Sequence, residues 1–168
     1  EQASYFFLDN RFGSTGSRLL SGDSHVFHDL ESKMALFKGK ESSLLFSSGY
    51  QCNVGVLPAL IDKGDAIFFD RLCHASIVDG VRLANVPFFR FQHNNMSHLK
   101  KILESKRSLF KRVIIVTESV FSMDGDMADL EAICNLSNFY NCELYVDEAH
   151  ATGLYGENGA GLVSDLEL

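Results

Sequence analysis

The 168-residue sequence has no long apolar run. Its longest runs are only a few residues, whereas about 20 are needed to cross a bilayer, so we expect no membrane span. No charged start followed by an apolar core appears at Glu1, so no secretion signal is predicted. An excess of positive charge is also lacking. The net charge of −7 argues against nucleic acid as a partner.

Cysteine pairs with the short C-x-x-C spacing of zinc and redox sites are absent. Wide separation of the four cysteines favours free thiols in a reducing cytoplasm over a disulfide framework; these are Cys52, Cys73, Cys134 and Cys142. With 46% hydrophobic and 22% charged residues, the composition is that of a globular protein. Neither a repeat nor a linker divides the chain, so a single domain is predicted over 1–168.

Helical and strand patterns alternate along the chain. Helical spacing predicts helices at 23–38, 49–60, 76–84, 96–105 and 130–140. Short apolar runs predict strands at 43–47, 66–70, 86–91, 113–117 and 143–146. The unbroken β-branched run at 113–117 is typical of a strand covered on both faces. This alternation predicts the α/β class, with a mostly parallel sheet flanked by helices.

The last predicted strand ends in Asp147, and His150 follows three residues later. Ligands bind at the carboxyl ends of strands in a parallel α/β sheet. An aspartate there, with an imidazole nearby, suits a cofactor with a basic ring nitrogen, such as pyridoxal phosphate. A carboxylate keeps the pyridine nitrogen of that cofactor protonated, so that the ring accepts electrons. Taken alone, the segment also fits a helix N-cap aspartate followed by a surface histidine.

Small residues precede Gly49 and Tyr50, where a predicted strand gives way to a helix. Such a turn lets backbone N–H groups approach an anion at a helix N-terminus, although a plain strand-to-helix turn has the same pattern. The glycine-rich segment Gly13–Arg18 ends in an arginine suited to an anion or carboxylate. Arg18 is therefore a candidate for binding substrate.

Two further segments follow predicted strands. His74 lies after the strand at 66–70, either as an ordinary residue at a helix start or as a planar group able to stack on a cofactor ring. The long loop after the strand at 113–117 carries the hydroxyl of Ser122 and the carboxyl of Asp124, which a minimal turn does not need.

Together these segments are stronger evidence for a cofactor-binding site than any one of them alone, because they occur in a single order at the ends of successive strands. The matching stretches are GSTGSRLLSGDSHVFHDLE, LFSSGYQCNVG, FFDRLCHASIVDG, VTESVFSMDGDMADLEAI and LYVDEAHATGLYGENGAG. From Gly13 to Gly161 the chain resembles the α-oxoamine synthases, a branch of the fold-type I pyridoxal phosphate enzymes. The resemblance implies the large, cofactor-binding domain of that fold.

The resemblance implies a role for each matching residue. Gly49 and Tyr50 are expected to direct backbone N–H groups toward the cofactor phosphate. His74 is expected to stack over the pyridine ring and to lie near the substrate.

At the edge of the pyridine ring, Asp147 is expected to pair with the protonated nitrogen, and His150 is expected to contact the phenolic oxygen. Ser122 is expected to hydrogen-bond near the cofactor, with Glu118 in a supporting position. Catalytic roles therefore fall to His74, Asp147 and His150.

Within the family, the stretches TESVFSMDGD and VDEAHATG most resemble enzymes that condense L-alanine with a pimeloyl thioester, with loss of carbon dioxide, to give 8-amino-7-oxononanoate. Glycine C-acetyltransferase and 5-aminolevulinate synthase share most of these stretches and stay as alternatives. The implied partners are small-molecule substrates and a second copy of the chain, in a cytoplasmic homodimer.

The family's Schiff-base lysine is expected a few tens of residues beyond His150, yet no lysine follows Lys111. The resemblance therefore implies the incomplete cofactor-binding core of a longer enzyme, which should not turn over alone. Two other hypotheses stay open: a non-catalytic partner subunit that lost the lysine, and a free-standing anion-binding module. The first has no reason to retain His74, Asp147 and His150.

Overall fold

A computed structural model describes residues 13–14 and 16–167. Residues 1–12, Thr15 and Leu168, which belong to the predicted domain, lie outside the described residues. The chain divides into two compact units, the first ending at Leu45 and the second beginning at Phe46. The single domain expected from sequence stays a prediction.

In the first unit, the predicted helix at 23–38 is confirmed as α2 (His25–Phe37). The strand predicted at 43–47 is wrong: this segment pairs with no strand among the described residues and bonds to α2 instead. The Ser43 hydroxyl donates to the carbonyl oxygen of Glu31 over 2.7 Å, and the Leu45 N–H donates to the Glu31 carboxylate over 2.7 Å. An apolar run forms a strand only where another strand accepts its hydrogen bonds.

The second unit contains a four-stranded, wholly parallel sheet. Its strands are β1 (Ala66–Asp70), β2 (Phe88–Phe91), β3 (Val113–Glu118) and β4 (Glu143–Asp147), in the order β2-β1-β3-β4. Every residue of β1 and β3 is buried, as expected for central strands with helices on both faces. The predicted parallel α/β sheet is confirmed.

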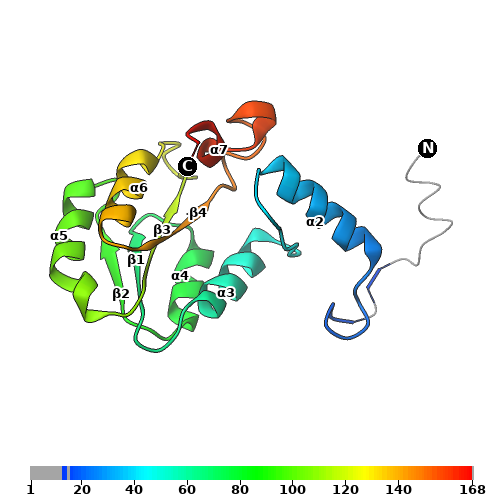
Figure 1. Cartoon of the computed structure of the whole chain (residues 1–168), viewed down its shortest axis with the longest axis horizontal. Helices are drawn as coiled ribbons and strands as arrows, with labels where there is room; N and C mark the ends of the chain where they lie inside the picture. Colours follow the sequence, from blue (N-terminus) through cyan, green and yellow to red (C-terminus); the bar gives the residue numbers. More distant parts are fainter. Residues whose placement is uncertain (1–12, 15, 168) are drawn as a thin grey trace. The chain divides into compact units, whose positions relative to one another are not determined.

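Helices cover both faces of this sheet. Figure 1 shows α3 (Gly49–Leu60) and α4 (Ala75–Leu83) on one side, and α5 (Met96–Lys106) and α6 (Leu130–Phe139) on the other. The remaining elements are short: η1 (Arg107–Leu109), η2 (Glu157–Gly159) and α7 (Leu162–Asp165). Among the described residues, no helix is long and apolar enough to cross a membrane.

The strand order also locates the carboxyl edge where a ligand is expected. From β1 the chain crosses to β2 on one side, whereas from β3 it crosses to β4 on the other. Right-handed crossovers in opposite directions put their helices on opposite faces, so the loops after β1 and β3 diverge. Open α/β sheets bind ligands outside the strand ends at such a switch point.

Candidate functional site

Asp147 ends β4 directly beside the last residue of β3, because Glu118 and Asp147 are register partners. One carboxylate oxygen, Oδ1, accepts the Ala149 N–H over 2.9 Å. The other, Oδ2, accepts the side-chain amide of Asn53 over 2.9 Å. Both donors are neutral, and no cation pairs with Asp147 among the described residues. This half-buried carboxylate can therefore pair with a cationic group that the described residues do not supply.

Glu118 connects the end of β3 to the start of α4. Its carboxylate accepts the backbone N–H of His74, the N-cap residue of α4. Burial raises the pKa of Glu118, the hydrogen bond from His74 opposes that rise, and the charge of Asp147 adds to it. The Glu118 carboxylate thus fixes the backbone that carries the His74 ring.

The His74 ring lies on a chain of hydrogen bonds that leads to Asp147. Its Nδ1 lies 2.7 Å from the Ser76 hydroxyl and accepts the Ser76 N–H over 3.2 Å. The Ser76 hydroxyl accepts the Asn53 side-chain amide over 2.9 Å, and the same amide reaches Asp147. The structure therefore brings His74 and Asp147 together through two intermediate side chains.

His150 lies exposed in the turn after β4, where the N–H groups of Ala151 and Thr152 both donate to the Glu148 carbonyl oxygen over 3.0 Å. Because it follows the last residue of β4 by three positions, His150 lies at the same carboxyl edge of the sheet as Asp147. The Glu148 carboxylate accepts the Val163 N–H over 2.9 Å and closes the loop between β4 and α7.

Gly49 and Tyr50 are the first two residues of α3, where backbone N–H groups have no acceptor within the helix. The Ser48 side chain caps the next position by accepting the Gln51 N–H over 3.2 Å. The Tyr50 hydroxyl donates to Asp79 over 2.8 Å. A coil precedes this helix start instead of the predicted strand, but the free N–H groups fit an anion.

Ser122 lies exposed in a small hairpin that follows β3. The Phe121 N–H donates to the Asp126 carbonyl oxygen over 3.0 Å, and the Gly125 N–H donates to the Phe121 carbonyl oxygen over 2.9 Å. Within the described ranges, no hydrogen bond joins Ser122 to Asp147 or His74. Its contact with a cofactor stays a prediction.

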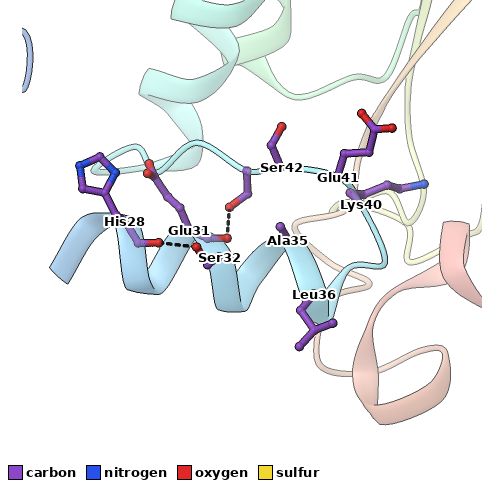
Figure 2. Close-up of a pocket in the computed structure, with 9 residues that line it drawn as sticks. His28, Glu31, Ser32, Ala35, Leu36, Lys40, Glu41 and Ser42 are labelled. Atoms are coloured by element: carbon purple, nitrogen blue, oxygen red, sulfur yellow. Dashed lines mark hydrogen bonds between the residues drawn. The ribbon is translucent and has the colours of Figure 1, made fainter. Parts of the chain in front are cut away.

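Arg18, the predicted substrate-binding residue, belongs to the first unit and is held there by two carboxylates. Its guanidinium makes a forked pair with Glu31 and donates to Asp23 over 2.9 Å. Figure 2 shows a pocket beside Glu31, between α2 and the segment 40–43. Hydroxyl groups there bond to the helix backbone: Ser32 donates to His28 and Ser43 to Glu31. None of the predicted site residues lines this pocket.

Sequence reasoning missed three polar side chains of the site. Asn53 and Ser76 are 3% and 1% exposed, and the hydroxyl of Tyr145 donates to Asn53 Oδ1 over 2.6 Å. A usable signal was the position of Asn53, four residues before the fully buried Leu57 on the same face of α3. A polar residue on a buried helix face needs hydrogen-bond partners.

A second polar cluster, at the end of β1, surrounds His93. Its ring Nδ1 lies 3.0 Å from Asp70 Oδ1, and its Nε2 lies 2.8 Å from Asp126 Oδ2. Burial lowers the pKa of His93, but the hydrogen bonds to Asp70 and Asp126 outweigh it, so the pKa is raised overall. The imidazole therefore ties the end of β1 to the hairpin after β3. Neither the sequence motifs nor the resemblance pointed to it.

A parallel sheet whose carboxyl edge carries an acid that pairs with no cation among the described residues, with a histidine joined to it by hydrogen bonds, is an arrangement suited to binding a cofactor. The family model described as aminotransferase class I and II matches residues 6–167. The chain belongs to that family.

Individual relatives support a narrower likeness. Over 159 residues the chain is 50% identical to 8-amino-7-oxononanoate synthase of Haemophilus ducreyi. The match covers 92% of this chain and 41% of the relative. The structure of 8-amino-7-oxononanoate synthase from Francisella tularensis matches with a TM-score of 0.77 at 31% identity, covering 94% of this chain and 42% of that one.

A serine palmitoyltransferase from S. paucimobilis, solved with bound pyridoxal phosphate–myriocin, matches with a TM-score of 0.87 at 34% identity, covering 92% of this chain and 38% of that one. The resemblance to α-oxoamine synthases is therefore confirmed. The chain spans about two-fifths of the length of these relatives, since it covers 38–42% of them.

Proposed function

We propose that this chain forms the pyridoxal phosphate-binding part of an enzyme that condenses L-alanine with a pimeloyl thioester, with loss of carbon dioxide, to give 8-amino-7-oxononanoate. The observation that carries the proposal is the set of partners around Asp147. Its carboxylate lies at the end of β4, each oxygen is held by one neutral donor, and no cation among the described residues balances its charge. The protonated ring nitrogen of pyridoxal phosphate is the cation that it lacks.

The donor set fits the rest of the cofactor. The N–H groups of Gly49 and Tyr50 would hold the phosphate at the start of α3. His74 would cover the ring, and His150 would contact the phenolic oxygen, with Ser122 nearby. When bound, pyridoxal phosphate supplies a ring that accepts electrons from a carbanion at the substrate α-carbon.

Each residue has a physical task toward that chemistry. An opposite charge at contact distance raises the pKa of a cation by about 1–3 units, so Asp147 keeps the ring nitrogen protonated near neutral pH. Glu118 fixes the backbone of His74, and the turn at Glu148 holds His150 at the same edge.

The proposal extends to a homodimer in the cytoplasm. Leu19 and Leu20, which flank the segment ending at Arg18, are 92% and 84% exposed, and an apolar surface of this kind is suited to a partner subunit. The four free thiols fit a reducing compartment. Light scattering on the enzyme that carries this chain should give twice the monomer mass, and a stable, active monomer would contradict the dimer.

The substitution Asp147→Asn tests the function. In the enzyme that carries this chain, turnover of L-alanine and pimeloyl-CoA should fall by about 10- to 1,000-fold, because each pKa unit that the ring nitrogen loses is a factor of ten in its protonated fraction. Asp165→Asn, an identical change of charge on an exposed residue of α7, is the control and should leave turnover unchanged. Equal turnover in both variants would refute the role of Asp147.

A further inference from the structure

Asn53 joins three elements of the site, because it belongs to α3 and its side chain contacts both β4 and α4. It is 3% exposed. Its amide bonds to Tyr145 and Asp147 of β4 and to Ser76 of α4, over 2.6, 2.9 and 2.9 Å. A buried amide with both hydrogens and its oxygen engaged is locked in one orientation.

The direction of each hydrogen bond follows from Asp147. A carboxylate only accepts, so the Nδ2 of Asn53 must face it, and the Oδ1 must face Tyr145. Tyr145 is therefore the donor to Asn53. The second Nδ2 hydrogen points at the Ser76 hydroxyl oxygen.

The Ser76 hydroxyl proton must then point away from Asn53. The acceptor within reach is Nδ1 of His74 at 2.7 Å, which also receives the Ser76 backbone N–H. A ring nitrogen that accepts two hydrogen bonds carries no proton, so the proton of the neutral imidazole is on Nε2.

We propose that Asn53 is a positioning residue that sets two groups of the site together: the orientation of the Asp147 carboxylate and, through Ser76, the Nε2-protonated form of His74. The proposal rests on the proposed function for its consequence, since these two groups contact the cofactor there. Its geometry is independent of any ligand.

The packing of α3 against α4 makes this chain of bonds possible. Gly80 lies one turn after Ser76 on α4, and a Cβ atom there would lie 2.5 Å from the backbone oxygen of Asn53. Only a residue without a Cβ allows the two helices to approach this closely. The approach places the Ser76 hydroxyl within hydrogen-bond distance of Asn53.

The substitution Asn53→Asp reverses the chain of bonds. The introduced carboxyl lies in contact with Asp147, so the two groups must share one proton there. It also accepts from Ser76, so the Ser76 oxygen turns toward His74 as an acceptor and draws a proton onto Nδ1. Nitrogen-15 NMR of the imidazole rings in the enzyme that carries this chain reports which nitrogen is protonated, with His74→Gln identifying the signal. We expect an unprotonated Nδ1 in the unchanged protein and a protonated Nδ1 in Asn53→Asp.

Ser76→Ala serves where Asn53→Asp does not fold. It removes the 2.7 Å donor and leaves only the 3.2 Å backbone N–H, so His74 should become a mixture of the two neutral forms. Ser137→Ala is the matched control. Ser137 is also buried in a helix, 5% exposed, and its hydroxyl donates to Cys142 over 2.8 Å, so the variant loses a similar bond far from His74.

Titration with pyridoxal phosphate gives a second readout. Affinity should fall by at least about 10-fold in Asn53→Asp, because Asp147 loses the hydrogen bond from the amide and shares a proton with the introduced carboxyl, and should stay unchanged in Ser137→Ala. An unchanged protein that takes up no pyridoxal phosphate would refute the proposed function, while the NMR result still decides the role of Asn53. A proton on Nδ1 in the unchanged protein, or His74 signals that neither variant alters, would overturn that role.

Discussion

Asp70 and Asp147 each end a strand of the same parallel sheet, but they have different partners. Asp70 is 1% exposed, and it accepts the N–H groups of Leu72 and Asn94 over 2.8 and 2.9 Å and contacts the His93 ring over 3.0 Å. Asp147 is half-buried and accepts two neutral donors. The charge of Asp70 is therefore matched inside the protein, and that of Asp147 is not.

The difference teaches that an acid at a strand end is not by itself a site. A buried carboxylate that meets an imidazole and two backbone donors is fully used in holding the loops after β1 and β2. A carboxylate that is held by neutral donors alone is fixed in position and can still pair with the cationic group of a ligand. The partners of the acid, and not its position on the sheet, separate a structural role from a functional one.

The largest expected effect is a difference in the free energy of unfolding between variants of the two aspartates. Asp70→Ala should lower the free energy of unfolding by about 3–5 kcal/mol, because it leaves His93 and two backbone N–H groups without their acceptor. Asp147→Ala loses only two neutral donors and should cost about 1–2 kcal/mol. Urea unfolding followed by circular dichroism measures both, and equal losses would remove the distinction.

A middle-sized effect concerns the helices that support Asp147. Gly80→Ala should destabilise the protein by about 1–3 kcal/mol, because the added methyl meets the backbone of α3. Gly55→Ala on α3 is the control. Its Cβ would meet only the Phe46 ring at 3.4 Å, and alanine is the better helix former, so that variant should gain up to about 1 kcal/mol. Thermal unfolding of both variants should show opposite signs.

The smallest effect is the pH dependence of the Asp70 cluster. Hydrogen bonds to Asp70 and Asp126 hold the pKa of His93 above its ordinary value of 6.5. The stability from this histidine is complete below 6.5 and is lost as pH rises through the raised pKa. The free energy of unfolding should therefore fall over that window, by at most about 1.4 kcal/mol per pH unit for one proton.

His93→Gln should flatten that slope. His98→Gln is the control, since the His98 ring accepts the Gln92 N–H over 2.9 Å and, in the part of the chain that the structure describes, contacts no carboxylate. A slope that persists in His93→Gln would assign the titration to another group.

Much of the fold could be predicted because the signals are local. The buried strands β1 and β3 are runs of apolar or β-branched residues, and the structure places them within a residue of the prediction. The same reasoning failed at 43–47, where an equally apolar run has no neighbouring strand in the part of the chain that the structure describes and bonds to Glu31 instead.

The site was less predictable because its contacts are distant in sequence. Asp147 and His74 follow strands and could be named from the motifs. Asn53 is 94 residues from Asp147 and 92 from Tyr145, so no periodic pattern links them. His93 was missed for the same reason, since Asp70 and Asp126 lie 23 and 33 residues away.

The close approach of α3 and α4 at Gly80 also limits which mutations this codon can tolerate. Every single-nucleotide missense change in a glycine codon yields a residue with a Cβ, and at this position a Cβ would lie 2.5 Å from the Asn53 carbonyl oxygen. A neighbouring side chain could rotate away, but a helix backbone cannot. We expect a library of random point mutants of the enzyme that carries this chain, selected for the proposed condensation of L-alanine with pimeloyl-CoA, to retain glycine at position 80 while Gly55 varies freely.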